Sequence, residues 1–140
     1  MGKAVKQGLF EFHCIDLRDF SKGHYKAVDD YPFGGKLGMV LRADVIARAI
    51  QSIPSYHDYD LVYPCPTGNL FEKQHAQGFA EQSKGLIFLC GYYEGVDVRV
   101  FNQFKVQKFS IGDVVLSSGE LPSLMMMDAT LRYRKGVLGN

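Results

Sequence analysis

Leu86-Ile87-Phe88-Leu89-Cys90, followed at once by Gly91-Tyr92-Tyr93-Glu94-Gly95, is the most informative stretch of this sequence. An apolar run without alternation is typical of a strand that is covered on both faces, as the strands of a parallel sheet are. The glycines that follow predict a tight turn at the end of the strand. We therefore expect a central strand over 86–90 with a functional loop behind it.

Helical patterns flank this strand on both sides. Val45, Ile46, Ala49, Ile50 and Ile53 recur at helical spacing and predict one apolar helix face. Asn69, with Glu72 three residues later, resembles a capping box that opens a helix through about Ser83. Pro122 favours the first turn of a last helix, which ends before Gly136.

Further strands are expected on period-two or short apolar patterns. Phe10, Phe12 and Cys14 alternate with polar residues, and 61–63 is a short strand stopped by Pro64 and Pro66. Two more strands are expected near 105–109 and at 113–116, whereas 18–41 is polar and glycine-rich and predicts a long functional or mobile loop. Alternating strands and helices predict the α/β class, with a mostly parallel sheet flanked by helices.

Length and charge bound the function. The chain has 140 residues, which suits one domain over 1–140, and its net charge of +1 argues against a broad nucleic-acid-coating surface while leaving room for a local basic patch. No apolar run approaches the roughly 20 residues of a membrane span, and the start has no signal-peptide core. Cys14, Cys65 and Cys90 are odd in number, which favours reduced thiols in a cytoplasmic protein.

Common catalytic motifs are missing from the sequence. It contains no G-x-G-x-x-G, P-loop, G-x-S-x-G, H-E-x-x-H or C-x-x-C pattern. The four histidines lack the spacing of metal ligands, so no metal site is expected. The cysteines at strand ends suit buried small residues better than nucleophiles, because no histidine lies nearby in sequence.

Three glycine-bearing segments follow the expected strands, at 63–68, 90–95 and 110–119. The carboxyl ends of parallel strands meet at one sheet edge, where ligands bind. Such loops present main-chain N–H and C=O groups that can hydrogen-bond an adenine. Taken one at a time they are also ordinary tight turns, and it is their convergence that points to a ligand site.

These segments resemble the bacterial tRNA (guanine-N1)-methyltransferases of the SPOUT superfamily. The resemblance rests on 29–35 (Asp-Asp-Tyr-Pro-Phe-Gly-Gly), 90–97, 110–113, 119–122 and the final Gly136-Val137-Leu138-Gly139-Asn140, and it extends from about Gly2 to Gly139. It implies a deep C-terminal trefoil knot, a bent S-adenosylmethionine held by the knotted loops, and a homodimer in which each site borrows residues from the partner. The implied reaction is methyl transfer to N1 of the guanosine 3′ of the tRNA anticodon.

The family's functional residues are carried over by position. The resemblance implies cofactor binding by Tyr63, Pro64, Cys65, Pro66, Gly91, Tyr93, Glu94, Gly95, Ser110, Ile111, Gly112, Val114, Leu116, Gly119 and Pro122. It places Glu94, Arg132 and Asp29 in the catalytic region. Without it, Glu94 is equally a helix-capping carboxylate, Arg132 a solvated residue of the last helix, and Asp29 a turn former.

Several positions depart from the family pattern. Tyr92 stands where the family usually has arginine, Ser118 replaces a glycine, and Lys36-Leu37 interrupts a glycine-rich stretch. The family's proposed general base is an aspartate on a linker beyond the equivalent of Leu138-Gly139, so no residue here is assigned that role. We expect a domain truncated at both ends relative to the family, which on its own binds the cofactor more readily than it transfers the methyl group.

Two other readings stay open at this point. A catalytically silent, dimeric S-adenosylmethionine-binding module has the same fold. A nucleotide hydrolase or oxidoreductase on a Rossmann-like sheet is remote, because no phosphate-binding loop is present.

Overall fold

The computed structural model describes residues 1–32, 34–35, 37–92 and 94–138. The elements in chain order are α1 (Gly2–Lys6), η1 (Leu17–Phe20), β1 (Asp29–Asp30), β2 (Val40–Leu41), α2 (Ala43–Gln51), η2 (Tyr56–Asp58), β3 (Asp60–Leu70), α3 (Lys73–Glu81), β4 (Leu86–Phe88), α4 (Arg99–Gln103), β5 (Val106–Ser110) and α5 (Glu120–Leu131). Within these residues, no helix is both long and apolar enough to cross a membrane.

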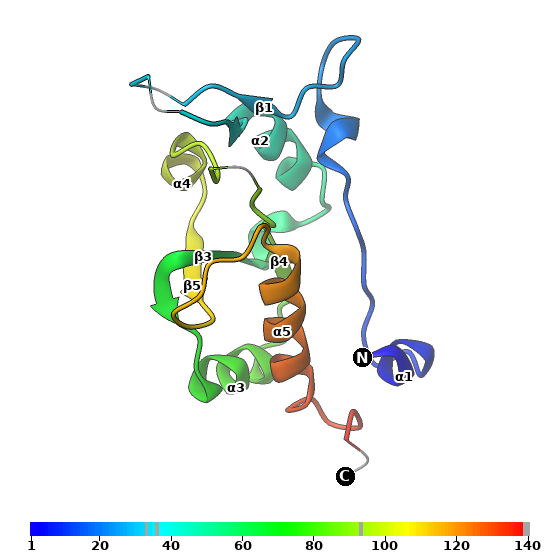
Figure 1. Cartoon of the computed structure of the whole chain (residues 1–140). Coiled ribbons are helices and arrows are strands. Elements are labelled where there is room, and N and C mark those ends of the chain that lie inside the picture. The colour runs from blue at the N-terminus through cyan, green and yellow to red at the C-terminus, as the bar shows by residue number, and fades with distance from the viewer. Residues whose placement is uncertain (33, 36, 93, 139–140) are drawn as a thin grey trace.

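A three-stranded parallel sheet lies at the centre, in the order β4-β3-β5 (Figure 1). Leu61 pairs with Ile87 on one side and with Val106 on the other. The predicted α/β class with a parallel sheet and flanking helices is thereby confirmed. The predicted strands over 86–90 and 105–109 and the helices over 45–53 and from 122 are all present, with boundaries shifted by a few residues.

Two apolar clusters cover the two faces of this sheet. Leu61 belongs to a cluster with Ile46 of α2 and Val100 of α4, whereas the next residue, Val62, packs with Phe79 of α3 and Met126 of α5. Successive strand side chains point to opposite faces, so β3 is buried on both. This explains why α2 and α4 lie on one side of the sheet and α3 and α5 on the other.

Several sequence predictions were wrong. Residues 10–14 form no strand: Phe12 is 46% exposed, and none of the strands in the described part of the chain pairs with this stretch. Residues 113–116 form a loop. The 18–41 stretch, expected to be a loop, contains η1 and the short antiparallel pair β1–β2.

Two boundaries also differ. β3 does not stop at Pro64 but continues to Leu70, because its pairing with β5 shifts register between Pro64 and Asn69. Asn69 therefore lies in a strand, and the cap of α3 is Glu72. Its side chain accepts from the His75 backbone, while the Glu72 backbone N–H donates to His75 Nδ1 at 2.9 Å. A capping box forms three residues later than predicted.

Candidate functional site

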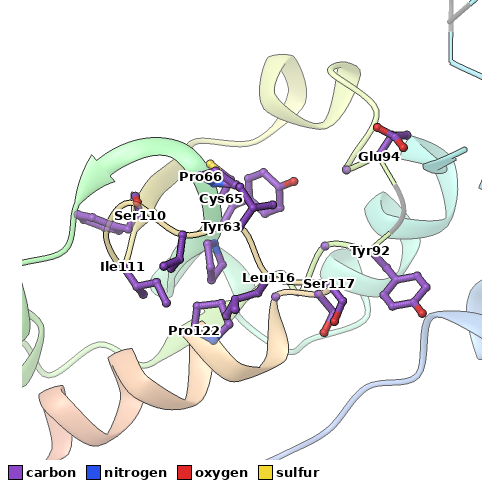
Figure 2. A pocket seen from close by; sticks show the side chains of 18 residues that line it. Tyr63, Cys65, Pro66, Tyr92, Glu94, Ser110, Ile111, Leu116, Ser117 and Pro122 are labelled. Atoms are coloured by element: carbon purple, nitrogen blue, oxygen red, sulfur yellow. The ribbon is translucent and has the colours of Figure 1, made fainter. Parts of the chain in front are cut away.

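A pocket of about 250 Å³ lies where the three parallel strands end (Figure 2). Its walls are the middle of β3, the segments that follow β4 and β5, and the first turn of α5 at Pro122. This is the sheet edge at which open α/β folds bind ligands. All but two of the predicted cofactor residues line it: Tyr63, Pro64, Cys65, Pro66, Gly91, Glu94, Gly95, Ser110, Ile111, Val114, Leu116, Gly119 and Pro122.

The two exceptions are Gly112, which does not line the pocket, and Tyr93, which lies outside the described residues, as does Lys36. The pocket also takes in residues that the cofactor prediction did not include: Tyr92, Phe109, Val115, Ser117 and Ser118. Each of these is a direct chain neighbour of a predicted residue. Predicting continuous segments rather than single positions would have found them.

The first wall comes from the bulge in β3. Pro64 and Asn69 both face Phe109 of β5, so the residues between them loop out and bring Cys65 and Pro66 to the pocket. Prolines suit a bulge because they have no N–H to leave unpaired. Gly68 is required at the return, since a Cβ there would lie 2.5 Å from the Phe109 nitrogen.

The second wall is formed by Gly91, Tyr92, Glu94 and Gly95, and residues 38–41 hold it in place. The Glu94 N–H donates to the Met39 carbonyl at 2.8 Å, and the Leu41 N–H donates to the Gly95 carbonyl at 2.9 Å. Gly38 leaves space for the Glu94 side chain, which a Cβ there would meet. Gly95 has φ +117°, a conformation that favours glycine.

The start of α5 closes onto this second wall. The Gly119 N–H donates to the Gly91 carbonyl at 2.9 Å, and the Ser123 hydroxyl donates to the Gly119 carbonyl at 2.7 Å. A Cβ on Gly119 would lie 2.8 Å from the Gly91 nitrogen, so the two backbones meet only because a glycine is present. Burial raises the pKa of the neighbouring Cys90 thiol, which suits a packing residue rather than a nucleophile.

The third wall is the turn after β5. The Ser110 hydroxyl donates to the Gly112 carbonyl at 2.9 Å, and Gly112 has φ +136°. A Cβ on Gly112 would meet nothing within 4 Å. Gly112 is therefore favoured for its backbone conformation and does not itself line the pocket, although the resemblance implies cofactor binding at this position.

The lining has an unusual charge balance. Of the lining residues that the structure describes, Glu94 is the only carboxylate, and none is Lys, Arg or His. Burial raises the pKa of the Tyr63 phenol above its ordinary value. The remaining surface is apolar (Ile111, Leu116) or carries serine hydroxyls and main-chain groups. Such a pocket fits an uncharged or cationic ligand better than a phosphate.

The predicted catalytic residues are not brought together within one chain. Glu94 lines the pocket. Asp29 lies in β1, paired with Leu41, and does not line it. Arg132 follows the last residue of α5 and lines a second cavity of about 290 Å³. Arg132 lies ten positions after Pro122 along α5, a rise of roughly 15 Å.

An ion pair that the sequence prediction missed supports the 91–95 segment. Asp97 is buried, and its carboxylate accepts from Arg99 Nη2 at 2.7 Å and from the Arg99 backbone N–H at 2.9 Å. The Asp97 N–H donates to the Leu41 carbonyl at 3.1 Å. Hydrogen bonds from Arg99 lower the pKa of the Asp97 carboxyl. Asp97 thereby joins the pocket loop to β2 and to the start of α4.

The chain is similar throughout its length to known proteins. A family model described as "tRNA (Guanine-1)-methyltransferase TrmD" matches residues 1–140. Relatives named tRNA (guanine-N(1)-)-methyltransferase include those of Ruegeria sp. (strain TM1040), 45% identical over 99% of this chain and 57% of the relative, and Chlorobaculum tepidum, 40% identical over 100% of this chain and 61% of the relative. A third, from Gluconobacter oxydans (strain 621H), is 40% identical over 99% of this chain and 59% of the relative. The chain spans about three fifths of the length of these curated relatives.

Proposed function

Because this chain belongs to the tRNA (guanine-1)-methyltransferase family, we propose that residues 1–140 form one S-adenosylmethionine-binding domain of a tRNA methyltransferase. The proposed reaction moves a methyl group to N1 of the guanosine 3′ of the anticodon. The observation that carries the proposal is the pocket at the strand ends, with one carboxylate and no described cationic side chain in its lining.

This lining fits S-adenosylmethionine better than it fits a nucleoside phosphate. The ligand combines an adenosine with a positive sulfonium and carries no phosphate, so it needs no Lys or Arg in the pocket. Main-chain groups of the glycine segments would hydrogen-bond its adenine, and Ile111, Leu116 and Pro122 would supply apolar contact. The negative Glu94 carboxylate would attract the positive sulfonium of the bound ligand.

When bound, S-adenosylmethionine supplies an electrophilic methyl group to a nucleophilic nitrogen. The part of this chain in the reaction is to orient that group, which requires rigid walls. Backbone hydrogen bonds between 91–95 and both 39–41 and Gly119 give this rigidity. The guanine N1 proton must also be removed, and we assign no residue of this chain as the base.

We further propose a homodimer and, as in the family, a deep trefoil knot near the C-terminus. Large apolar side chains are exposed at the pocket and along the first turns of α5: Val115, which lines the pocket, is 80% exposed, and Leu121 and Met125 of α5 are 63% and 56% exposed. Exposed apolar surface of this kind marks protein interfaces. A partner chain packed there would also explain how Asp29 and Arg132 reach a pocket that they do not line within one chain. Light scattering that finds a stable monomer at micromolar concentration would contradict the shared site.

The proposal places the enzyme in the cytoplasm with its tRNA substrate, and a methyl-transfer assay tests it. Radiolabelled S-adenosylmethionine is incubated with the protein and tRNA transcripts that carry a guanosine 3′ of the anticodon. Matched transcripts carry adenosine at that position. Label incorporated only into the guanosine transcripts, at the low rate expected of this chain alone, supports the reaction, and label in both kinds of transcript contradicts it. Absence of label together with absence of S-adenosylmethionine binding contradicts the proposed function.

A further inference from the structure

Positive charge is concentrated at the two ends of the chain. Lys3 and Lys6 occur within residues 1–10, and Arg132, Arg134 and Lys135 within 129–138, and neither stretch contains an Asp or Glu. The whole chain has a net charge of only +1. The rest of the molecule is therefore slightly acidic, so these five cations are a local feature.

The fold brings the two ends together. The second cavity is lined by Lys3 and Ala4 of α1 and by Leu131 and Arg132 at the end of α5. Figure 1 shows α1 near the C-terminal end of α5 and far from β1 and α2. Lys3 and Arg132 line the same cavity, and Lys6, Arg134 and Lys135 lie within three residues of them in the chain. All five side chains are exposed, and we term them the basic surface. Asp128 is the one acidic residue that lines the cavity beside it.

An aromatic ring lies within this charge cluster. Tyr133 stands between Arg132 and Arg134, is 39% exposed, and has the Arg132 guanidinium carbon 6.0 Å from its ring centroid. Exposed aromatic and arginine planes between cations suit unpaired bases next to a phosphate backbone. An acidic protein segment would need the cations but would make no use of the ring.

We propose that the basic surface binds the phosphate backbone of RNA, at a position that lies, within one chain, at the opposite end of α5 from the methyl-transfer pocket. This inference rests on the proposed function, because it takes tRNA as the substrate. The pocket itself offers no described cation to the RNA. Phosphate contacts therefore have to come from another surface, and they position a substrate without reading its bases.

The salt dependence of RNA binding tests the assignment. Fluorescence anisotropy with a labelled anticodon stem–loop RNA is measured over a range of salt concentrations for the unsubstituted chain and for Arg134→Gln/Lys135→Gln. The control, Lys22→Gln/Lys84→Gln, removes the same charge at exposed positions that line neither cavity. The binding constant falls as salt rises, and each lost phosphate contact makes this negative slope of log K against log salt shallower by about 1. We expect the slope to become shallower by about 1.5–2 in Arg134→Gln/Lys135→Gln and to stay unchanged in the control.

Three results would overturn this inference: equal slopes for the two variants, no RNA binding by the unsubstituted chain, or equal affinity for polyglutamate and RNA, which would indicate an acidic protein partner. Calorimetric titration with S-adenosylmethionine is run on the same samples. Cofactor binding that survives in all of them while RNA binding fails the test would reject the basic surface and leave the proposed pocket standing. Loss of cofactor binding in the unsubstituted chain would instead reject the proposed function.

Discussion

The two ends of α5 differ in backbone packing and in charge. At its N-terminal end, Gly119 packs backbone against backbone on Gly91, and Ser123 is 1% exposed. At its C-terminal end, Arg132, Arg134 and Lys135 are exposed to solvent. One face of the first end packs tightly against the Gly91 backbone, and the pocket beside it has a single carboxylate in its described lining, whereas the second end is followed by exposed cations.

This contrast indicates a division of labour along one helix. A small ligand needs a rigid, desolvated pocket, because orientation within a fraction of an ångström controls the transfer rate. A polyanion needs accessible cations instead, since its binding energy comes largely from released counterions. Substitutions at the two ends should therefore separate ligand binding from RNA binding.

The largest effect is expected from Gly119→Val. The new side chain would start 2.8 Å from the Gly91 nitrogen and 2.9 Å from Cys90 Cα, both backbone atoms that cannot turn aside. We expect a loss of about 1–3 kcal/mol in the free energy of unfolding and a rise of about tenfold or more in the Kd for S-adenosylmethionine. Thermal unfolding and calorimetry measure the two.

Gly78→Ala is the matched control. Gly78 lies within α3, where a Cβ would meet nothing within 4 Å. This change should raise the free energy of unfolding by roughly 0.5–1 kcal/mol and leave the Kd unchanged. If Gly119→Val bound S-adenosylmethionine with the affinity of the unsubstituted chain, the backbone contact between Gly91 and Gly119 would not shape the pocket.

Asp97→Asn should weaken the fold on the pocket side by roughly 1–3 kcal/mol at neutral pH, because it removes a charge-assisted pair from a buried group. The pKa of Asp97 is lowered in the folded state from 3.8. Its contribution to stability is therefore full above that value and is lost as pH falls through the lower, folded pKa.

Denaturant unfolding over a pH series checks the sign. The difference in the free energy of unfolding between the unsubstituted chain and Asp97→Asn should shrink as the pH falls below about 3.8. Asp58 is exposed, so the control variant Asp58→Asn should have a free energy of unfolding within about 0.5 kcal/mol of that of the unsubstituted chain. A difference that grows towards acid would refute the assigned role of the Asp97–Arg99 pair.

Glu94→Gln tests whether the carboxylate in the pocket favours a positively charged ligand. Replacing the single carboxylate of the described lining should raise the Kd for S-adenosylmethionine about three- to fivefold, since Glu94 is exposed and its ion pair with the ligand is partly screened. S-adenosylhomocysteine has no sulfonium charge and should be less affected. Equal weakening of both ligands in competition binding would remove the electrostatic role.

Ser118→Gly is expected to have the smallest effect. Ser118 is half-buried in the pocket wall, where its side chain takes up room beside the ligand. The Kd for S-adenosylmethionine should stay within about twofold or fall. A clear rise would mean that the hydroxyl makes a contact with the ligand, which equilibrium dialysis of Ser118→Ala would then confirm by showing the same rise.

The buried parts of the fold were predictable because burial leaves a pattern. The apolar run at 86–90 and the helical spacing from Val45 to Ile53 both correspond to core elements. The alternation at Phe10 and Phe12 was misleading, since alternating residues make a strand only where another strand pairs with them. Pro64 was taken as a stop because the register shift that accommodates it depends on β5, forty residues further along the chain.

The candidate site was predictable as segments and less so as single residues. The glycine-bearing segments do converge, because parallel strands end at one edge. Gly112 lies off the lining, since a glycine needed for positive φ and one needed for space look the same in sequence. The Asp97–Arg99 pair was missed because its importance comes from the burial of Asp97 against β2, which local sequence does not reveal.

The central claim is that the strand-end pocket takes a cationic, phosphate-free adenosine ligand, and a paired calorimetric titration tests it most directly. The chain is titrated with S-adenosylmethionine and, in parallel, with ATP under the same buffer and salt. We predict saturable binding of S-adenosylmethionine at one site per chain and no measurable binding of ATP. Binding of ATP as tightly as S-adenosylmethionine, or no binding of S-adenosylmethionine at all, would contradict the account.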